Sequence, residues 1–490
     1  MSIKKILILC IIFILFILNF IPNIEKFSNL KNNYFKIIIT TYNPGISLLK
    51  KCLKSIEIQN YKNYDVCIID DASTKEKNEI KDLLEEYEKK YNWKYLQSEK
   101  NYGPCYSRNK AIEILNPNKD DIIVCVDGDD ELYNKNVLKK LNNYYQDEKL
   151  LITFGNYVRK YSNGKIDKNK YIKFKSNELN NIISNKGFRK IKLFKFSHLK
   201  TFKFKLYNKI NMNDLKKNGE FIRSSTDIAI MLPMLEMSGK NIKFIDEKLY
   251  KYTFDHPESL HSNKIKRNKQ KKNSLYIKSL SKYEEVDFDK LFFIHIPKNA
   301  GTSIENVGSK NNYLWGKEYN FNMDEEEIQN LVQNKSIWHL PPKYLPENKN
   351  PYKRYTNFAI VRNPYDRMVS EYKYYKNMSS KNLVDYNIND FVKYVKYKFS
   401  EDKFYYGCHF IPQSEFIFGN PKCDEILIFE NLEYDFNNLL KKYNYPPMKL
   451  PFDNKSSGGD TVKDLNKYSI KIINEIYEDD FKNFGYKMIK

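Results

Sequence analysis

A loop with the composition of an anion-binding site lies in FFIHIPKNAGTSIENV (292–307), which predicts a strand, a tight polar loop and a helix. The small and hydroxyl-bearing residues of this loop are Ala300, Gly301, Thr302 and Ser303. Free N–H groups at the helix start, together with these hydroxyls, can surround a phosphate. The pattern GxxxxGK[ST] is absent because Lys298 precedes the glycine, which argues against an ATP-driven kinase. A lysine at this place suits the neutralisation of charge on a departing oxygen.

A second candidate anion site lies in FAIVRNPYDRMVSEY (358–372). Arg362 ends a predicted strand, and Ser370 follows eight residues later on the predicted helix. The guanidinium can bind a phosphate with two parallel hydrogen bonds, and the hydroxyl can reach the same group. Either loop alone has a structural explanation, but the pair indicates a two-part site for an anionic donor.

Together, HIPKNAGTS and VRNPYDRMVS resemble the donor loops of Golgi-type carbohydrate sulfotransferases, similar to the heparan sulfate 2-O and 6-O enzymes. HFIPQSEFIFG, ILIFENLEYDF and IYEDDFKNFGY extend the resemblance over about 290–488. It implies a P-loop-like α/β domain that binds the sulfate donor PAPS (3′-phosphoadenosine 5′-phosphosulfate), with Lys298 in a catalytic role. The PAPS-binding residues that it implies are Lys298, Asn299, Ala300, Gly301, Thr302, Ser303, Arg362 and Ser370.

Sulfate transfer needs a base for the acceptor hydroxyl, and the resemblance places a histidine between the two loops. His339, in SIWHLPP, meets this condition and is the predicted catalytic base. The alternative is a loop histidine that packs beside Trp338. We expect His295 to be structural and His409 to be an alternative substrate contact. No metal is expected in this half.

Polar clusters follow the predicted strands of the N-terminal half, at 40–43, 70–71 and 127–130. Ligands of parallel α/β sheets bind at the carboxyl ends of the strands. Two carboxylates at such a strand end can hold Mg²⁺ or Mn²⁺, which also neutralises a diphosphate. Acidic turns are common without a metal, so DGDD is a weak signal by itself.

The order TTYN, IIDDAS, NYGPCYSRN, VDGDDEL resembles the family 2 glycosyltransferases, which are inverting enzymes with a GT-A fold. The resemblance covers about 35–262. It implies a nucleotide-sugar donor, of the UDP type, and Asp129 as the ligand of Mn²⁺ or Mg²⁺. The nucleotide-sugar-binding residues that it implies are Thr40, Tyr42, Asp70, Asp71, Arg108, Asn109 and Asp127.

Asp227, in SSTD, matches the late acidic residue of this family, the general base that deprotonates the acceptor. Its structural alternative is a helix N-cap, since a helical apolar run follows at once. Residues 159–215 are rich in Lys and Phe and contain no recognised motif. We expect the acceptor, a glycan or glycoconjugate, to bind there, and its identity stays open.

Alternating apolar runs and amphipathic stretches position these motifs. Strands are predicted at 35–41, 65–70, 94–98, 121–127 and 290–296, with helices at 46–58, 76–90 and 105–115. Continuous apolar strands separated by helices indicate a parallel α/β sheet. A basic stretch, SNKIKRNKQKKNS, suggests a linker, so the predicted domains are 34–262 and 290–490, joined by 263–289.

The chain has 490 residues with 83 Lys+Arg against 61 Asp+Glu, a net charge of +22. This length suits two domains, and the positive charge suits anionic donors. A nucleic-acid partner is not expected. The leading interpretation is a bifunctional enzyme that transfers a sugar and sulfates a carbohydrate. The alternative is a single-activity carbohydrate sulfotransferase whose other domain serves as a glycan-binding module.

Residues 6–18 are uninterrupted apolar and follow Lys4 and Lys5. This pattern predicts an uncleaved signal-anchor helix within 1–33 and a single-pass type II membrane protein with lumenal domains. A cleaved signal peptide is the alternative. Among the seven cysteines, Cys408 and Cys423 are candidates for a disulfide in an oxidising lumen.

Overall fold

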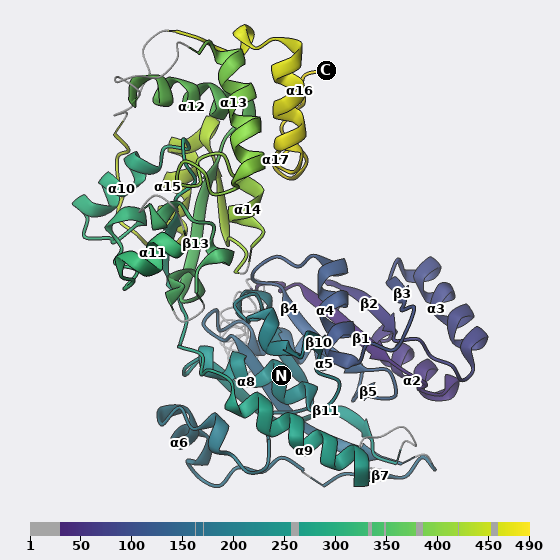
Figure 1. Cartoon of the computed structure of the whole chain (residues 1–490). Helices are drawn as coiled ribbons and strands as arrows, with labels where there is room; N and C mark the ends of the chain where they lie inside the picture. The colour runs from purple at the N-terminus through teal and green to yellow at the C-terminus, as the bar shows by residue number, and fades with distance from the viewer. Residues whose placement is uncertain are drawn as a thin grey trace, which may run out of the picture. The chain divides into compact units, whose positions relative to one another are not determined.

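The computed structural model describes residues 30–490, except 162, 170, 256–263, 332–335, 347–348, 379–385, 420 and 452–458. The chain forms two compact α/β units, as predicted. The first consists of the described residues up to Tyr207 together with Asn213–Tyr283, and the second of Asn208–Met212 and Glu284–Lys490. Figure 1 shows both units.

A mixed nine-stranded sheet forms the first unit, in the order β3-β2-β1-β4-β8-β6-β11-β5, with β7 paired to β6. Its strands and those of a small hairpin are β1 (Phe35–Thr41), β2 (Tyr64–Asp70), β3 (Lys94–Gln97), β4 (Ile122–Asp127), β5 (Glu131–Leu132), β6 (Ile152–Lys160), β7 (Ile166–Asp167), β8 (Lys200–Lys203), β9 (Lys216–Lys217), β10 (Glu220–Phe221) and β11 (Ile242–Thr253). The first four strands are parallel, which confirms the predicted parallel core. Strand β8 runs antiparallel to β4, so the whole sheet is mixed.

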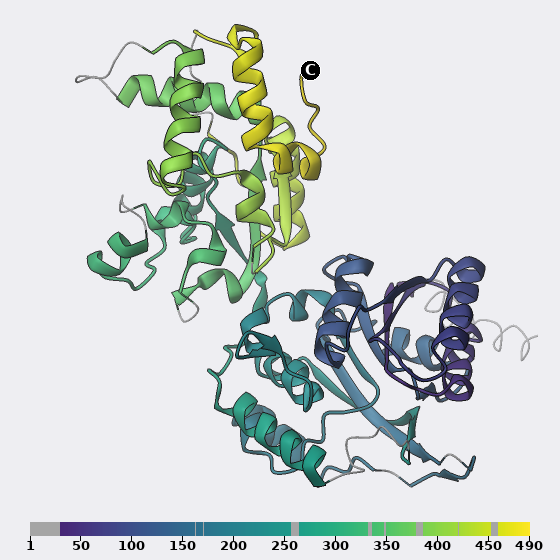
Figure 2. The same ribbon diagram turned by 45° about the vertical axis from the view of Figure 1, so that its right-hand side comes forward.

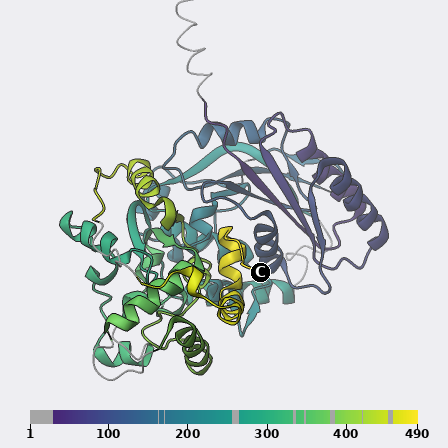
Figure 3. The ribbon, with the colours of Figure 1, turned by 90° about the horizontal axis from the view of Figure 1, so that it is seen from above.

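Helices cover both faces of this sheet (Figures 2 and 3). They are α2 (Ile46–Glu57), α3 (Lys77–Tyr91), α4 (Pro104–Leu115), α5 (Val137–Tyr144), α6 (Glu178–Ser184), α7 (Phe204–Tyr207), α8 (Thr226–Met237) and α9 (Lys264–Ser279). Helix α2 buries Leu49, Cys52, Leu53 and Ile56, the i, i+3, i+4, i+7 stripe of an amphipathic helix. With α3 and α5 it packs on the continuous apolar strands β1, β2 and β4. Helix α4 packs against β1, β2 and α8.

The second unit has a three-stranded parallel sheet, β12-β13-β14. Its elements are β12 (Asp287–Ile294), α10 (Gly301–Lys310), α11 (Glu325–Leu331), β13 (Tyr355–Val361), α12 (Pro364–Met378), α13 (Ile388–Glu401), α14 (Gln413–Ile417), β14 (Glu425–Ile428), α15 (Leu432–Lys442), α16 (Lys467–Ile476) and α17 (Glu478–Phe484). Apolar side chains of α10 and α15 cover one face of the sheet. Helices α12, α13 and α16 gather beyond one end of the sheet and share their own apolar core (Figure 1).

The basic segment predicted as a linker contains helix α9, which belongs to the first unit. Asn273 donates to the Ser224 hydroxyl at 2.9 Å, and the Ser225 hydroxyl donates to the Gln270 carbonyl at 2.7 Å. Ile277 is buried on the same helix. The sequence does not reveal this inner face, because basic and polar residues dominate the composition of the segment.

The membrane prediction needs correction. The predicted anchor helix falls on residues 1–29, which lie outside the described part of the chain. In the described ranges, no helix is both long and apolar enough to cross a membrane. The longest of them, α9, has 16 residues and is strongly basic, whereas a span needs about 20 mostly apolar residues. The predicted single-pass, lumenal localisation is therefore withdrawn.

The short segment Asn208–Met212 interrupts the first unit in sequence but belongs to the second unit. The Lys209 side chain is fully buried and forms an ion pair of 3.0 Å with Asp424, which is 2% exposed. Its ammonium also donates to the carbonyls of Tyr352 and Tyr355 at 3.1 and 2.7 Å. The second unit is thus completed by a lysine that lies 75 residues before its main segment begins at Glu284 (284 − 209 = 75).

We expect Lys209→Met to destabilise the second unit by about 3–5 kcal/mol, because it leaves the Asp424 carboxylate buried without its cation. Chemical denaturation of the second unit measures this loss. The matched control is Lys442→Met, whose pair with Glu425 is half exposed on the lysine side and should contribute at most about 1 kcal/mol. Equal stability of the two variants would contradict the prediction.

Candidate active sites

In the first unit, the carboxyl ends of β1, β2 and β4 meet at one edge of the sheet. Thr41 is level with Asp70 on β2, and Thr40 is level with Asp127 on β4. The polar residues expected from the sequence are therefore brought together because the three strands are parallel and in register. Gly128, the residue after β4, lies against Thr41. A Cβ at this position would lie only 2.5 Å from the Thr41 hydroxyl oxygen.

A buried cation organises this edge. Arg108 on α4 is 4% exposed and donates to Asp127 at 2.8 Å and to Asp227 at 3.4 Å. Burial opposes the charge of Arg108, but the two carboxylates outweigh burial and raise its pKa. Lys200 on β8 donates to Asp227 at 2.8 Å. Burial would raise the pKa of Asp227, yet Lys200 and Arg108 outweigh it and hold that pKa well below its usual range.

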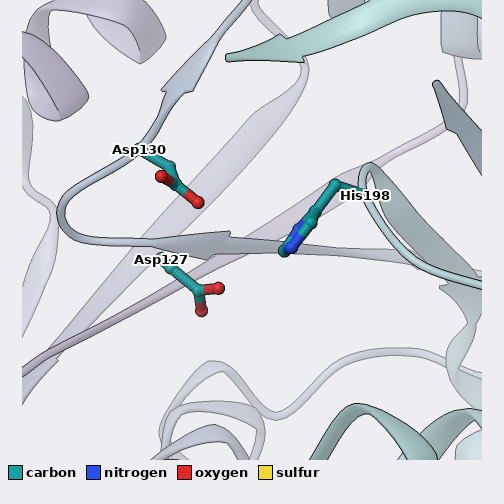
Figure 4. A group of neighbouring side chains, drawn as sticks. All are labelled: Asp127, Asp130 and His198. Carbon is teal, nitrogen blue, oxygen red and sulfur yellow. The ribbon is translucent and has the colours of Figure 1, made fainter. Parts of the chain in front are cut away.

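Asp127, Asp130 and His198 form a group able to hold a metal ion, with one ligand atom from each within 4.8 Å of the others (Figure 4). Asp130 Oδ2 and His198 Nδ1 are buried and have no hydrogen-bond partner in the described ranges. Burial raises the pKa of Asp130 well above its usual range, and Asp129 and Asp127 add to this rise. Burial lowers the pKa of His198 to about 4, which keeps the imidazole neutral. Crowded carboxylates beside a neutral imidazole fit a divalent cation.

Two members of this group, Asp130 and His198, were not expected from the sequence, and Asp129, the predicted ligand, is not part of it. Asp130 belongs to the DGDD motif that was predicted as a metal site, although Asp129 was the ligand expected there. His198 gives no local signal, because it lies about 70 residues from the acidic turn (198 − 130 = 68) and reaches it only through the pairing of β8 with β4.

The other residues predicted to contact the nucleotide differ in whether their side chains already have hydrogen-bond partners within the protein. Both Asp71 oxygens already accept backbone N–H groups, from Tyr102 at 2.8 Å and Gly103 at 2.7 Å. Asp70 accepts from the backbone and hydroxyl of Ser73. Through these hydrogen bonds, Asp70 and Asp71 fix the conformation of the loops around the site.

Among the remaining contacts, Tyr42 is partly exposed and Thr40 is buried in the sheet. Asn109 accepts from the Tyr207 hydroxyl at 2.9 Å and donates to Glu113 at 2.6 Å. The structure thus does not bring the Asn109 side chain into the group around Arg108.

In the second unit, the loop between β12 and α10 turns sharply. Lys298 and Ala300 have positive φ angles of 68° and 62°. A Cβ at Gly301 would lie 2.1 Å from Nε2 of His295, so glycine is required there. Asn299 is 1% exposed and donates to the Ile360 carbonyl at 2.7 Å and to Gln413 at 2.6 Å. Asn299 therefore anchors the loop to β13 and is not among the residues that line the neighbouring cavity.

The two predicted donor loops open onto one cavity of about 520 Å³. Its polar and charged lining comprises His295, Lys298, Thr302, Ser303, His339, Arg362, Ser370, His409 and Glu433. Arg362 donates to the Lys298 carbonyl at 3.1 Å, and its guanidinium lies 4.1 Å from the centre of the Phe429 ring. The structure therefore brings together both predicted loops and the predicted base.

Arg367, on the same helix as Ser370, has a sequence position that suits either a second donor contact or a surface ion pair, but the structure makes it a buried positioning residue. It is 3% exposed and donates to the carbonyls of Pro297, Ile411 and His409 at 3.1, 3.0 and 2.8 Å. It thereby ties the donor loop to the segment that carries His409. Cys408 and Cys423, the candidates for a disulfide, are both buried free thiols.

Three histidines stand side by side in the cavity. The His339 ring centre lies 4.5 Å from that of His295 and 5.0 Å from that of His409. Each flanking histidine contacts a buried carboxylate through Nδ1: His295 pairs with Glu305 at 2.7 Å, and His409 with Glu371 at 2.9 Å. Burial lowers the pKa of His339 well below its usual range, and the two neighbouring imidazoles add to this effect.

Comparisons with known proteins agree with this division. Residues 36–211 match the model of glycosyl transferase family 2, and residues 283–487 match that of the sulfotransferase family. The glycosyltransferase GlyG of Streptococcus pneumoniae is 27% identical over 121 residues, which are 25% of this chain and 38% of that protein. An uncharacterized glycosyltransferase of Haemophilus influenzae is 32% identical over 122 residues, 25% of this chain and 46% of that protein. The chain thus spans less than half the length of these bacterial relatives.

Solved structures also resemble the chain. S. aureus TarS 1-349 in complex with UDP-GlcNAc is 24% identical, with a TM-score of 0.36, over 47% of this chain and 61% of that one. The mannosyltransferase PcManGT from Pyrobaculum calidifontis, in complex with GDP-Man and Mn²⁺, is 16% identical with a TM-score of 0.34, over 52% and 68%. From these two family matches, the chain contains a glycosyltransferase family 2 domain followed by a sulfotransferase family domain.

Proposed function

We propose that the first domain transfers a sugar from a nucleotide sugar of the UDP type. The second domain transfers a sulfuryl group from PAPS to a carbohydrate hydroxyl. The acceptor in both cases is a glycan or glycoconjugate.

One observation carries the sulfate-transfer half of this proposal. Lys298 and Arg362 line the same cavity, and burial lowers the pKa of each. Neither forms an ion pair with a carboxylate within 4.0 Å in the part of the chain that the structure describes, and Arg362 Nε has no hydrogen-bond partner there. Two partly buried cations without such a partner support a cavity that takes an anion with two charged ends.

Several of the residues that line the cavity have a role in this reaction. Arg362 and Ser370 bind the 3′-phosphate, while the start of α10, with Thr302 and Ser303, surrounds the 5′-phosphosulfate. Lys298 stabilises the negative charge that develops on the leaving phosphate oxygen. The acceptor proton goes to an imidazole of the cavity, a role for which the sequence resemblance proposes His339.

In the first domain, a divalent cation, Mn²⁺ or Mg²⁺, fits Asp127, Asp130 and His198, with Asp129 in the same turn. When bound, it neutralises the diphosphate of the donor. Asp227 accepts the proton of the acceptor hydroxyl. Arg108 holds Asp127 and Asp227 in place, since it donates to both.

Lys298→Ala should lower the rate of PAPS-dependent sulfate transfer by about 10²–10³-fold, because the leaving oxygen loses its cation. The measurement incubates the protein with PAPS and a panel of carbohydrate acceptors and reads product masses. Asp227→Asn is the control, and it should lose sugar transfer while sulfate transfer persists. Undiminished sulfate transfer by Lys298→Ala would refute the assignment.

Removal of divalent cations with EDTA should abolish sugar transfer and leave sulfate transfer intact, because the cation group lies in the first domain. Both reactions are followed in the same sample with a panel of nucleotide sugars, PAPS and acceptors. Added Mn²⁺ or Mg²⁺ should restore sugar transfer. Sugar transfer that persists through chelation would contradict the metal assignment.

Lys200→Met should move the acid limb of the sugar-transfer pH profile to higher pH. Lys200 helps to hold the pKa of Asp227 below its usual range, so its loss raises that pKa. Asp227 acts as a base only when ionised, and a higher pKa leaves it protonated, hence inactive, up to a higher pH. Lys203→Met is the matched control, since this buried lysine of the same strand donates to the Glu148 carbonyl. An unmoved limb, or one moved to lower pH, would argue against Asp227 as the base.

A further inference from the structure

We propose that His409, held by Glu371, takes the proton of the acceptor hydroxyl during sulfate transfer. This inference rests on the sulfotransferase activity proposed above. It adds a catalytic residue, His409, and a positioning residue, Glu371, in place of the base expected from the sequence.

The pair has the geometry of a histidine oriented by a carboxylate. His409 Nδ1 lies 2.9 and 3.1 Å from the two oxygens of Glu371, whose side chain is 4% exposed. An ionised carboxylate can only accept, so Nδ1 carries the hydrogen and Nε2 keeps its lone pair. A carboxylate in this place also stabilises the imidazolium that forms when Nε2 takes a proton.

The pair stands beside the cation that acts on the leaving group. Tyr374 stacks on the His409 ring with centres 5.7 Å apart, and the Lys298 ammonium lies 3.9 Å from the centre of the Tyr374 ring. Ser370 and Tyr374 lie one turn apart on α12, with Glu371 between them in sequence. One helix therefore places a donor contact, the carboxylate and the aromatic spacer around the cavity that His409 lines.

The other two histidines are less suited to receive the proton. His339 Nδ1 is closed off from solvent and has no hydrogen-bond partner in the described ranges. Burial disfavours its protonated form, and no carboxylate is paired with it in those ranges. His295 has Glu305 as its partner, but its Nε2 faces Gly301 so closely that a Cβ there would lie 2.1 Å away. His295 therefore supports the donor loop.

The acceptor in this step is an alcohol. The acceptor oxygen forms a bond to sulfur while its proton moves to His409 Nε2. The bond between sulfur and the bridging oxygen breaks, and its electron pair stays on the 5′-phosphate, next to Lys298. The products are the sulfate ester, 3′-phosphoadenosine 5′-phosphate (PAP) and an imidazolium paired with Glu371.

The test compares His409→Ala, His339→Ala and Glu371→Gln in the full-length protein. Sulfate transfer from PAPS is measured with the acceptor panel and with water as the alternative acceptor, and PAP binding is measured by calorimetry. His409→Ala should lower kcat by about 10²–10⁴-fold, the usual contribution of a general base, while PAP affinity is kept. Added imidazole should restore part of the activity of His409→Ala, because a small base can occupy the space left by the side chain.

Glu371→Gln should also lower kcat, and ¹⁵N NMR of the histidine side chains should show that His409 loses its preference for hydrogen on Nδ1. Glu475→Gln, an exposed carboxylate on α16, is the matched control and should leave both readouts unchanged. A residue that only supports the fold would not produce rescue by imidazole or a change of tautomer.

The outcomes separate this inference from the proposed function. Failure of the wild-type protein to bind PAP would overturn both. PAP binding with full turnover by His409→Ala would overturn the role of His409 alone. Imidazole rescue of His339→Ala, without rescue of His409→Ala, would return the role of base to His339.

Discussion

Buried charge must be balanced, and the two domains meet this constraint in different ways. In the first domain, the Arg108 guanidinium is shared by two carboxylates of the protein, Asp127 and Asp227, and Lys200 adds a second cation. In the second domain, Lys298 and Arg362 are partly withdrawn from water without such a carboxylate in the described ranges. A charge removed from water without a partner is costly. The first site is therefore balanced within the protein, whereas we propose that an anionic donor completes the second.

This difference has consequences for how each proposed base would work. Asp227 is held in its ionised form by neighbouring cations, which secures its charge but weakens its affinity for a proton. His409 has a partner of the opposite charge type, since the Glu371 carboxylate lies 2.9 Å from its Nδ1. Both arrangements depend on neighbouring side chains of opposite charge. The glycine at position 301 and Arg367 act in the same supporting way, because they fix the donor loop against the histidine cluster.

Buried polar and charged side chains also hold the second domain together. Lys209 neutralises Asp424, and Asp424 also accepts the backbone N–H of Asn357 on β13 at 2.8 Å. Gln413 accepts from Asn299 and from the backbone of Arg362, so it joins the two donor loops. Asp480 in turn holds Gln413 through backbone and side-chain contacts. The donor cavity is thus positioned by buried polar side chains from distant parts of the chain.

Much of this protein could be predicted from its sequence. Strands β1, β2, β3, β4 and β12 and helices α2, α3 and α4 lie where apolar runs and amphipathic periods placed them. The two donor loops were also recognised, because the residues of each lie close together in sequence. The sequence did not predict three features. These are the packing of α9 as a helix of the first unit, the contribution of His198 to the cation group, and the Glu371–His409 pair. Each depends on residues that only strand pairing or helix packing brings together. Local sequence thus determined the elements and short motifs of this protein, because their signals come from neighbouring residues. Which of several histidines and carboxylates meet was decided by the tertiary structure, since burial and partners at long separation set their charge.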